Sequence, residues 1–314
     1  MVTVVVLGTW NLENLFRPDG GAQAYDAKLA ALASTITTLS PDVLAVQEVG
    51  QPEALADLVA RLGGEWHTEL AAPDGRGIRV GFISRLPLAG VEQVADFPDK
   101  LRPVQVDDTG APVSTMGRPA LHVRVEAAGR AFDLVSCHLK SKLLTFPGGR
   151  FSTSDEGLRA RYAVYALNRR AAEAATVRDY ATRLLDGQGD QRAVLVLGDL
   201  NDEPEAATTQ ILLGPPGSEI GTGGFTQPDQ GDGQRLWNLA PLIPAEQRYS
   251  RIYQGRRELI DHILASGAVA RTLTEGDVTS GGATPASIGD NPHARADQPG
   301  SDHRPLVVEV ADRP

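Results

Sequence analysis

The sequence predicts an α/β fold in which two β-sheets pack face to face and helices cover their outer surfaces. Short apolar runs rich in β-branched residues recur along the chain, which is typical of buried strands. Helical patterns are few and lie mainly between these runs. With 314 residues, 41% of them hydrophobic, the chain can bury a large core, and no repeat or linker divides it. We therefore expect one domain that spans residues 1–314.

The expected strands run from the first residues of the chain to the last. Each is an apolar run, and two of them form a predicted hairpin across Ala128-Gly129. Several runs end in a polar residue, where the strand leaves the core. The expected ranges are Val2–Leu7, Asp42–Glu48, Gly77–Ser84, Leu121–Val125, Ala131–His138, Ala193–Leu197, Glu258–Leu264 and Leu306–Val310.

Helices are expected between these strands. Residues 25–39 carry Leu and Ala at helical spacing, and Ser40-Pro41 ends the pattern. Residues 52–62 form a shorter helix that Gly63-Gly64 stops, and residues 159–185 form the longest one. Three Gly- and Pro-rich segments are long for ordinary loops, which is typical of functional or disordered segments: 98–119, 214–233 and 276–300.

Composition limits the function. A net charge of −10 and a pI of about 5.1 argue against a protein that coats nucleic acid through a broad basic surface, but they allow local contacts. The single cysteine, Cys137, lies in an apolar run, so we expect a buried thiol and no internal disulfide. No stretch is long enough for a membrane span, and no signal peptide precedes Val2. We expect a cytoplasmic monomer, although a secreted protein without its leader would look the same.

One polar stretch follows the apolar run 193–197. Its residues Gly198, Asp199, Leu200 and Asn201 alternate, so a continuing strand would place Asp199 and Asn201 on one face. A carboxylate beside a neutral amide can orient a water molecule or hold a hard cation with little like-charge repulsion. The alternative is a simple turn, because Gly, Asn, Asp and Pro are the commonest turn residues.

Polar residues of the same kind stand at the ends of the other expected strands. Side chains at one edge of a rigid sheet are where ligands and catalytic groups gather. Glu, Asp and Asn oxygens suit Mg²⁺, Mn²⁺ or Ca²⁺, whereas a zinc site would favour Cys and His. Plainer alternatives are a solvated strand end, a buried core histidine or a polar turn. The residues are Asn11, Glu48, His138, Asp199 with Asn201, Asp261, and Asp302 with His303.

On these motifs the chain resembles the endonuclease/exonuclease/phosphatase superfamily, the DNase-like metal-dependent phosphoesterases. The resemblance covers nearly the whole chain, with the motifs in family order, and it implies a four-layer α/β sandwich with two packed, mostly antiparallel sheets. The motifs are Trp10-Asn11-Leu12-Glu13-Asn14, Val46-Gln47-Glu48-Val49, Ser136-Cys137-His138-Leu139-Lys140, Gly198-Asp199-Leu200-Asn201, Ile260-Asp261-His262-Ile263 and Ser301-Asp302-His303-Arg304-Pro305.

The resemblance also implies roles for the residues near the metal. Glu48 would be the main ligand of Mg²⁺, with Mn²⁺ or Ca²⁺ as substitutes, and Asn11 and Asp302 would lie close to the ion. Asp199 and Asn201 would orient the attacking water and the phosphate. A cation and hydrogen-bond donors at the phosphoryl oxygens would lower the barrier to in-line attack.

The remaining implied roles concern protons and substrate. His303 would act as a base or proton relay oriented by Asp261, and His138 would contact a phosphate oxygen or assist the leaving group. His262 should point to the opposite face from Asp261 and serve structure. Basic residues close in sequence to this edge could line the substrate path: Lys140, Lys142, Arg150, Arg159, Arg161 and Arg304.

The resulting hypothesis is a divalent-metal-dependent phosphodiester hydrolase, a nuclease acting on DNA or RNA. One alternative is a phosphomonoesterase or a phosphodiesterase acting on phospholipids or inositol phosphates. Another is a catalytically inactive binding module, although such a protein would be free to lose Glu48, His138, Asp199 or His303. The Tyr or Arg that meets the scissile phosphate in many relatives is not placed by sequence; segment 144–161 is the candidate region.

Overall fold

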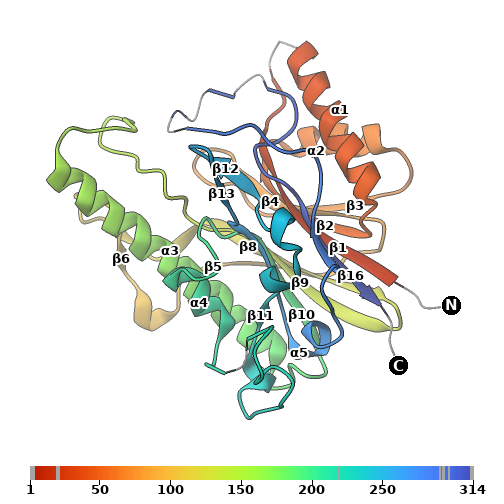
Figure 1. Cartoon of the computed structure of the whole chain (residues 1–314). Coiled ribbons are helices and arrows are strands. Elements are labelled where there is room, and N and C mark those ends of the chain that lie inside the picture. The colour runs from red at the N-terminus through yellow and green to blue at the C-terminus, as the bar shows by residue number, and fades with distance from the viewer. Residues whose placement is uncertain are drawn as a thin grey trace.

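The computed structural model describes residues 4–18, 22–217, 219–289, 291, 294–295 and 298–311. Two six-stranded sheets lie face to face, and helices cover the outer face of each (Figure 1). The four-layer α/β sandwich expected from the sequence is therefore confirmed. Among the described residues, no helix combines the length and apolar character that crossing a bilayer requires.

The first sheet contains the N- and C-terminal strands. All its neighbours are antiparallel except β1 and β2, which run parallel. Its order across the sheet is β15 (Val278–Ser280), β16 (Leu306–Ala311), β1 (Val4–Leu15), β2 (Val43–Val49), β4 (Arg79–Ser84) and β3 (His67–Leu70).

The second sheet is built from the middle of the chain. Here β9 and β10 run parallel and the other neighbours are antiparallel. Its order is β11 (Trp237–Asn238), β14 (Asp261–Ala265), β10 (Ala193–Asp199), β9 (Arg130–His138), β8 (Thr115–Ala127) and β5 (Ala89–Asp96).

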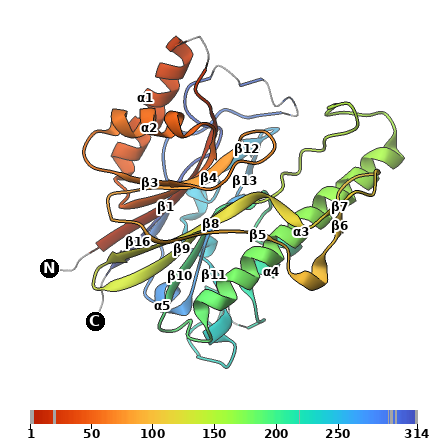
Figure 2. The same cartoon turned by 180° about the vertical axis from the view of Figure 1, so that it is seen from behind.

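Three apolar clusters hold the four layers together. One lies between the sheets and includes Leu7, Phe82, Leu134 and Leu195. A second packs the outer face of the first sheet on α1 (Ala22–Leu39) and α2 (Pro52–Leu62), and a third packs the second sheet on α3 (Glu156–Leu185) and α4 (Ala207–Leu213). Figures 1 and 2 show α1 and α2 on one side and α3 with α4 on the other. Both faces of each sheet are thus buried, which explains why the central strands are almost wholly apolar.

Short elements fill the connections. Two hairpins stand outside the main sheets: β6 (Val104–Gln105) with β7 (Pro112–Val113), and β12 (Arg251–Tyr253) with β13 (Arg256–Glu258). The remaining helices are α5 (Gly267–Ala270) and the 3-10 turns Asp99–Leu101, Asp232–Gln234, Ala240–Leu242 and Ala245–Gln247.

Several expected boundaries are wrong. The first strand continues to Leu15, because a register shift after Asn11 accommodates Glu13 and Asn14 at positive φ, so Asn11 lies inside the strand and not at its end. The expected strand 258–264 splits between β13 and β14.

Strands β3 and β5 were missed because they are polar and half-exposed. Val2 and Thr3, and parts of segments 214–233 and 276–300, lie outside the described residues.

Candidate active site

Three polar side chains form a row across one end of the second sheet. Asp199 ends β10 and pairs in register with His138, the last residue of parallel β9, and with Asp261, the first residue of antiparallel β14. The ends of β9 and β10 and the start of β14 thus lie at the same edge of the sheet. Gly198 allows this close packing, because a Cβ there would collide with the carbonyl oxygen of Cys137, and its φ of +152° suits only glycine.

The first sheet contributes Asn11 and Glu48 to the same edge. Glu48 has a φ of +58°, an unusual conformation for a glutamate. Its Oε2 accepts a hydrogen bond of 2.9 Å from the backbone N–H of Asn14, which fixes the carboxylate. Glu48 keeps 20% of its side chain exposed, so an ion arriving from solvent can reach it.

Asn11 joins the two sheets. Its Nδ2 donates to Glu48 Oε1 at 3.2 Å and to Asp199 Oδ2 at 3.0 Å. The Asn11 Oδ1 accepts from the backbone N–H of Glu13 at 2.9 Å, which fixes the amide orientation. Asn201 is fixed similarly: its N–H donates to Asp199 Oδ1 at 2.9 Å and its Nδ2 to Leu139 O at 3.0 Å.

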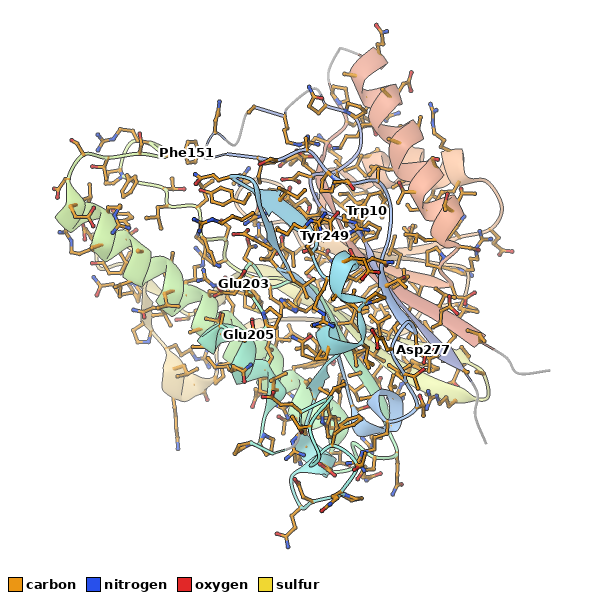
Figure 3. The ribbon with its side chains drawn as sticks, in the orientation of Figure 1. Trp10, Phe151, Glu203, Glu205, Tyr249 and Asp277 are labelled. Carbon is orange, nitrogen blue, oxygen red and sulfur yellow. The ribbon has the colours of Figure 1, made fainter. Side chains whose placement is uncertain are left out.

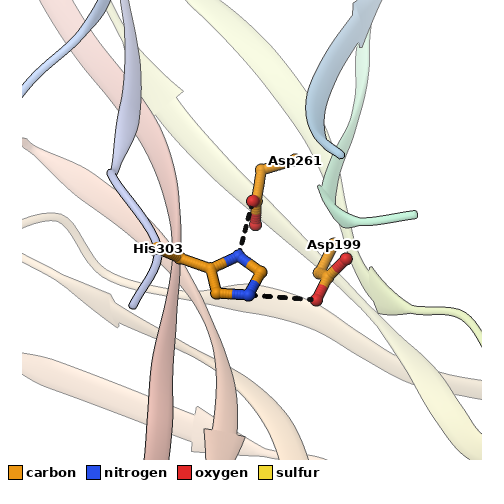
Figure 4. A group of neighbouring side chains, drawn as sticks. All are labelled: Asp199, Asp261 and His303. Carbon is orange, nitrogen blue, oxygen red and sulfur yellow. Dashed lines mark hydrogen bonds and ion pairs between the residues drawn. The ribbon is translucent and has the colours of Figure 1, made fainter. Parts of the chain in front are cut away.

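His303 reaches the row from the segment before β16. Its Nδ1 lies 2.7 Å from Asp261 Oδ2, and its Nε2 lies 4.0 Å from Asp199 Oδ2 (Figure 4). Two aromatic residues labelled in Figure 3 hold this segment. Trp10 Nε1 donates to His303 O at 2.9 Å, and the Tyr249 ring lies 4.4 Å from the Arg304 guanidinium carbon. The imidazole is therefore positioned from both sides.

The buried charges set opposite protonation states for the two histidines. Burial favours neutral His303, but the carboxylates of Asp261, Asp302 and Asp199 outweigh it and raise the pKa of His303 to about 10. Burial, with the positive charges of Arg118 and His303, holds the pKa of His138 well below its usual range. Burial and Asp261 raise the pKa of Asp199. In the metal-free protein at neutral pH, His303 thus carries a proton and His138 does not.

We predict that these states are visible by NMR. In protein stripped of divalent cations, the imidazole nitrogens of His303 should still report a protonated ring at pH 8, whereas those of His138 should report a neutral ring at pH 6. Two-dimensional ¹H–¹⁵N spectra recorded across this range, assigned with His138→Gln and His303→Gln, make the measurement. A single common titration of both rings near pH 6.5 would contradict the charge arrangement described above.

The raised pKa of His303 also makes the free energy of unfolding depend on pH. The pKa of His303 is raised from 6.5 to about 10, so folding strengthens proton binding there. The stabilisation is complete below pH 6.5 and is lost as the pH rises through 10.

The donor set fits a divalent cation. Glu48, Asp199, Asp261 and Asp302 bring four carboxylates to one edge, and Asp199 and Asp261 are at least 98% buried. The Asp261 Oδ1 is buried with no hydrogen-bond partner among the described residues. Excess buried negative charge is costly unless a cation or a proton compensates it. Oxygen donors of this kind match Mg²⁺, Mn²⁺ or Ca²⁺.

The carboxylates divide into two groups. Asp199, Asp261 and His303 offer ligand atoms within 4.8 Å of one another. However, Asp261 Oδ2 is already engaged by His303 Nδ1, and a protonated imidazole has no lone pair to offer a metal. The second group is Glu48 and Asp302, with Asn11 beside Glu48. Their carboxylates are 20% and 14% exposed, so an ion from solvent reaches this group more easily. This favours Glu48 and its neighbours as the metal site, and the other three residues as a proton-handling group.

Most of the basic residues predicted to line the substrate path form ion pairs or hydrogen bonds within the protein. Lys140 Nζ donates to Ser141 O and Leu143 O, both at 2.8 Å, and burial lowers the pKa of Lys140 to about 8. Lys142 is 47% exposed and pairs with Asp202 at 2.9 Å. Of the two, Lys142 is the one whose charge faces solvent.

The helix arginines are engaged too. Arg159 pairs with Glu156, and Arg161 pairs with Asp108 at 3.2 Å on the exposed part of α3. Arg150 donates to Pro147 O at 3.2 Å. Arg304 is only 8% exposed and donates to the carbonyls of residues 280 and 281, so its guanidinium is engaged within the fold. Substrate contacts by Arg159 and Arg161 stay a prediction.

Sequence reasoning missed Glu13, its partner Arg295, and Arg118, which support this edge. Glu13 accepts from Arg295 at 2.8 and 3.1 Å and from the Asp302 N–H at 2.9 Å; its alternation with Asn11 was the available signal. Arg118 lies in a segment that the sequence marks only as a loop. It donates to His138 O at 3.2 Å and Leu139 O at 3.3 Å.

His262 points away from the row, as expected from its alternation with Asp261. Its Nε2 lies 2.8 Å from Asp202 O and its Nδ1 lies 3.2 Å from Asn238 Nδ2, which is a structural role.

Comparisons with known proteins agree with this geometry. The family model described as the Endonuclease/Exonuclease/phosphatase family matches residues 8–303. A comparison with curated protein sequences finds no match.

Solved structures share the fold at low identity. Truncated TDP2 from Caenorhabditis elegans is 15% identical, with a TM-score of 0.57 over 98% of this chain and 97% of that one. The human Nocturnin catalytic domain with bound sulfate is 16% identical, with a TM-score of 0.57 over 98% and 93%. The 3'-5' exonuclease NExo from Neisseria meningitidis is 18% identical, with a TM-score of 0.55 over 98% and 99%.

Proposed function

This chain belongs to the endonuclease/exonuclease/phosphatase family, whose members are metal-dependent phosphoesterases, and on that premise we propose that it is a divalent-metal-dependent nuclease. The observation that carries the proposal is the edge where Glu48 and Asn11 from one sheet meet His138, Asp199 and the Asp261–His303 pair. The reaction is hydrolysis of a phosphodiester bond in DNA or RNA.

The metal-binding residues in this proposal are Glu48, Asn11 and Asp302. A bound Mg²⁺ supplies positive charge at a non-bridging phosphoryl oxygen, where negative charge builds during attack. Glu48 is suited to hold it because the Asn14 N–H fixes its carboxylate while one face stays open to solvent. Asn11 keeps Glu48 and Asp199 within hydrogen-bond reach of one amide, which holds the proposed metal ligand and the proposed proton acceptor close together.

Asp199 is the proposed acceptor of the water proton. Its pKa is raised by burial and by Asp261, which makes it a stronger base than an ordinary aspartate. His303 is already protonated at neutral pH, so it is better suited to relay a proton and to stabilise charge than to act as the first base. Asp261 keeps the imidazole oriented through its 2.7 Å contact with Nδ1.

His138 and Asn201 are proposed to contact the phosphate. His138 is neutral, so one ring nitrogen can donate a hydrogen bond to a phosphoryl oxygen without bringing extra charge. The Asn201 amide donates to Leu139 O, next to His138 in the chain, which ties the position of Asn201 to that of His138. Preorganised donors of this kind stabilise a transition state without reorganisation during the reaction.

A second candidate is hydrolysis of a phosphomonoester or a lipid head group by the same residues. The observation in its favour is the acidic chain, with a net charge of −10, which repels a long polyanion. The two candidates differ in the positive charge that they need near the site. A nuclease needs basic side chains that bind the phosphates next to the reacting one.

The test is a substrate panel. Plasmid DNA, a single-stranded oligonucleotide, RNA, bis-p-nitrophenyl phosphate, p-nitrophenyl phosphate and sphingomyelin are incubated with Mg²⁺, Mn²⁺ or Ca²⁺, and with chelator. We expect cleavage of nucleic acid and of the small diester that stops in chelator and in Glu48→Gln. Hydrolysis of only the phosphomonoester or sphingomyelin would refute the nuclease assignment and favour the second candidate.

A further inference from the structure

Two arginines that sequence reasoning did not single out keep guanidinium N–H groups without a partner among the described residues. Arg76 lies in the turn between β3 and β4, and Arg251 is the first residue of β12. In both cartoon views this turn and the β12–β13 hairpin rise at the same edge of the sandwich (Figures 1 and 2).

Arg76 is tied to the His138 side of the site. The Asp74 carboxylate accepts from the Arg76 N–H at 2.8 Å and from Arg118 Nη1 at 3.3 Å, and Arg118 in turn donates to His138 O at 3.2 Å. The Arg76 side chain is exposed and takes part in none of the ion pairs found among the described residues. Its positive charge also acts on His138, where it helps to keep the imidazole neutral. The turn thus holds an exposed guanidinium whose charge acts on His138.

Arg251 is tied to the His303 side. Its backbone bridges that of His303, and the following Arg304 N–H donates to Ser250 O at 2.7 Å. One guanidinium nitrogen pairs with Glu258 Oε2 at 2.7 Å, while the buried Nε has no hydrogen-bond partner among the described residues. Asp199 and Asp302 lie close enough to act electrostatically on this guanidinium. Part of its donor capacity is therefore unused next to the reacting centre.

Arg76 acts electrostatically on His138, and the Arg251 backbone pairs with that of His303, so the two arginines mark opposite ends of one line through the site. From Arg76 the line passes through His138, whose Nε2 is 3.4 Å from Asp199 Oδ2, and then to His303, whose Nε2 is 4.0 Å from the same oxygen. Arg251 follows His303. A phosphodiester chain laid along this line places its reacting phosphate at Asp199 and its neighbours near the two guanidinium groups. Arginine suits this task because its planar fork binds phosphate in two-point contacts.

We propose that Arg76 and Arg251 bind the phosphates on either side of the reacting phosphodiester, so that the nucleic-acid strand crosses the site from the β3–β4 turn to the β12–β13 hairpin. This inference rests on the proposed nuclease function and names the path of its substrate. The path differs from the one predicted along Lys142, Arg159 and Arg161. Positive charge at two points, on an acidic body, favours a short footprint that reads backbone and not bases.

The experiment compares Arg76→Gln, Arg251→Gln and Arg251→Lys with the wild type and with Arg183→Gln, and includes Arg159→Gln and Arg161→Gln to test the alternative path along α3. Arg183 is an exposed arginine on α3 that pairs with Asp179, so its change removes the same charge elsewhere. Affinity for a fluorescent single-stranded oligonucleotide is measured by anisotropy in Ca²⁺ across a salt series, and KM is measured in Mg²⁺ for the oligonucleotide and for bis-p-nitrophenyl phosphate. Thermal melts identify any variant that is misfolded, and the Arg76 variant, on an exposed turn, tests the proposal independently of the half-buried Arg251.

We expect each Gln variant to raise the ratio of oligonucleotide KM to small-diester KM about tenfold. Each should also make the slope of log affinity against log salt shallower by about 0.7, the loss of one phosphate contact on a single strand. Arg251→Lys should keep most of the salt slope, since it keeps the charge, and Arg183→Gln should match the wild type.

Other outcomes overturn the path. If wild-type enzyme cuts nucleic acid but the Arg76 and Arg251 variants keep its KM ratio and salt slope, the path is wrong and the nuclease function stands. If Arg159→Gln and Arg161→Gln lower the slope instead, the strand follows α3. If the wild type neither binds nor cuts an oligonucleotide yet hydrolyses another substrate of the panel, the nuclease function fails and the path fails with it.

Discussion

Replacing Glu48 with Gln is expected to lower kcat/KM by roughly two to three orders of magnitude, with little change in the fold. The change removes one negative charge and keeps the side-chain size. Loss of one preorganised electrostatic contact to a transition state typically costs about this factor. The substituted amide also offers a single oxygen where the carboxylate offers two, so accepting the hydrogen bond from the backbone N–H of Asn14 competes with binding the ion.

The readout that separates metal binding from other effects is the melting temperature. An ion that binds only the folded protein raises its stability by an amount set by concentration over Kd. Millimolar Mg²⁺ should therefore raise the Tm of the wild type and raise that of Glu48→Gln much less. Glu65→Gln, at an exposed position outside the site, is the matched control and should behave as the wild type. Full activity of Glu48→Gln, or of the wild type in chelator, would contradict the assigned role.

Much of the fold could be predicted because its central strands are buried on both faces. Runs such as residues 193–197 and 306–310 are apolar almost throughout, and a strand inside a sandwich needs that composition. The strands β3 and β5 lie at the edges of their sheets, are only partly buried and lack regular alternation, so no pattern marked them. The bulge after Asn11 was equally hidden, because Glu13 and Asn14 adopt positive φ without any glycine to signal it.

The candidate site was predictable to the extent that it is built from strand ends. Residues such as Asp199 and His138 follow buried runs, and neighbouring strands bring such ends together. The substrate path was less predictable, because closeness in sequence to His138 is a poor guide to free charge. Lys140 follows it by two residues yet its ammonium binds its own loop, whereas Arg76 is 62 positions away and is exposed. The partners of each cation in the folded structure, and not its place in the sequence, distinguish an engaged cation such as Lys140 from an exposed one such as Arg76.

Burial also changes what is expected of His303. Its place before a strand suggested an imidazole open to water, but only 6% of the residue is exposed. With Asp261 fully buried beside it, the pair resembles an internal salt bridge as much as a catalytic group. Removing one partner of such a pair leaves an uncompensated charge and costs about 3–5 kcal/mol. A single substitution therefore cannot distinguish a catalytic role from a structural one.

A double-mutant cycle on this pair is expected to separate the two roles. His303→Gln should lower kcat by roughly two to three orders of magnitude and lower the Tm by roughly 5–10 °C at pH 7, because the buried Asp261 carboxyl group loses its cationic partner. Asp261→Asn should lower the pKa of His303, since it removes the first of the charges that raise it, and should lower kcat less. In the double variant two neutral amides can hydrogen-bond, so most of the lost Tm should return while kcat stays at the level of His303→Gln. Melts and initial rates with bis-p-nitrophenyl phosphate measure both quantities. If kcat instead recovers together with the Tm, the pair serves the fold, and the proton relay must be sought in Asp199 alone.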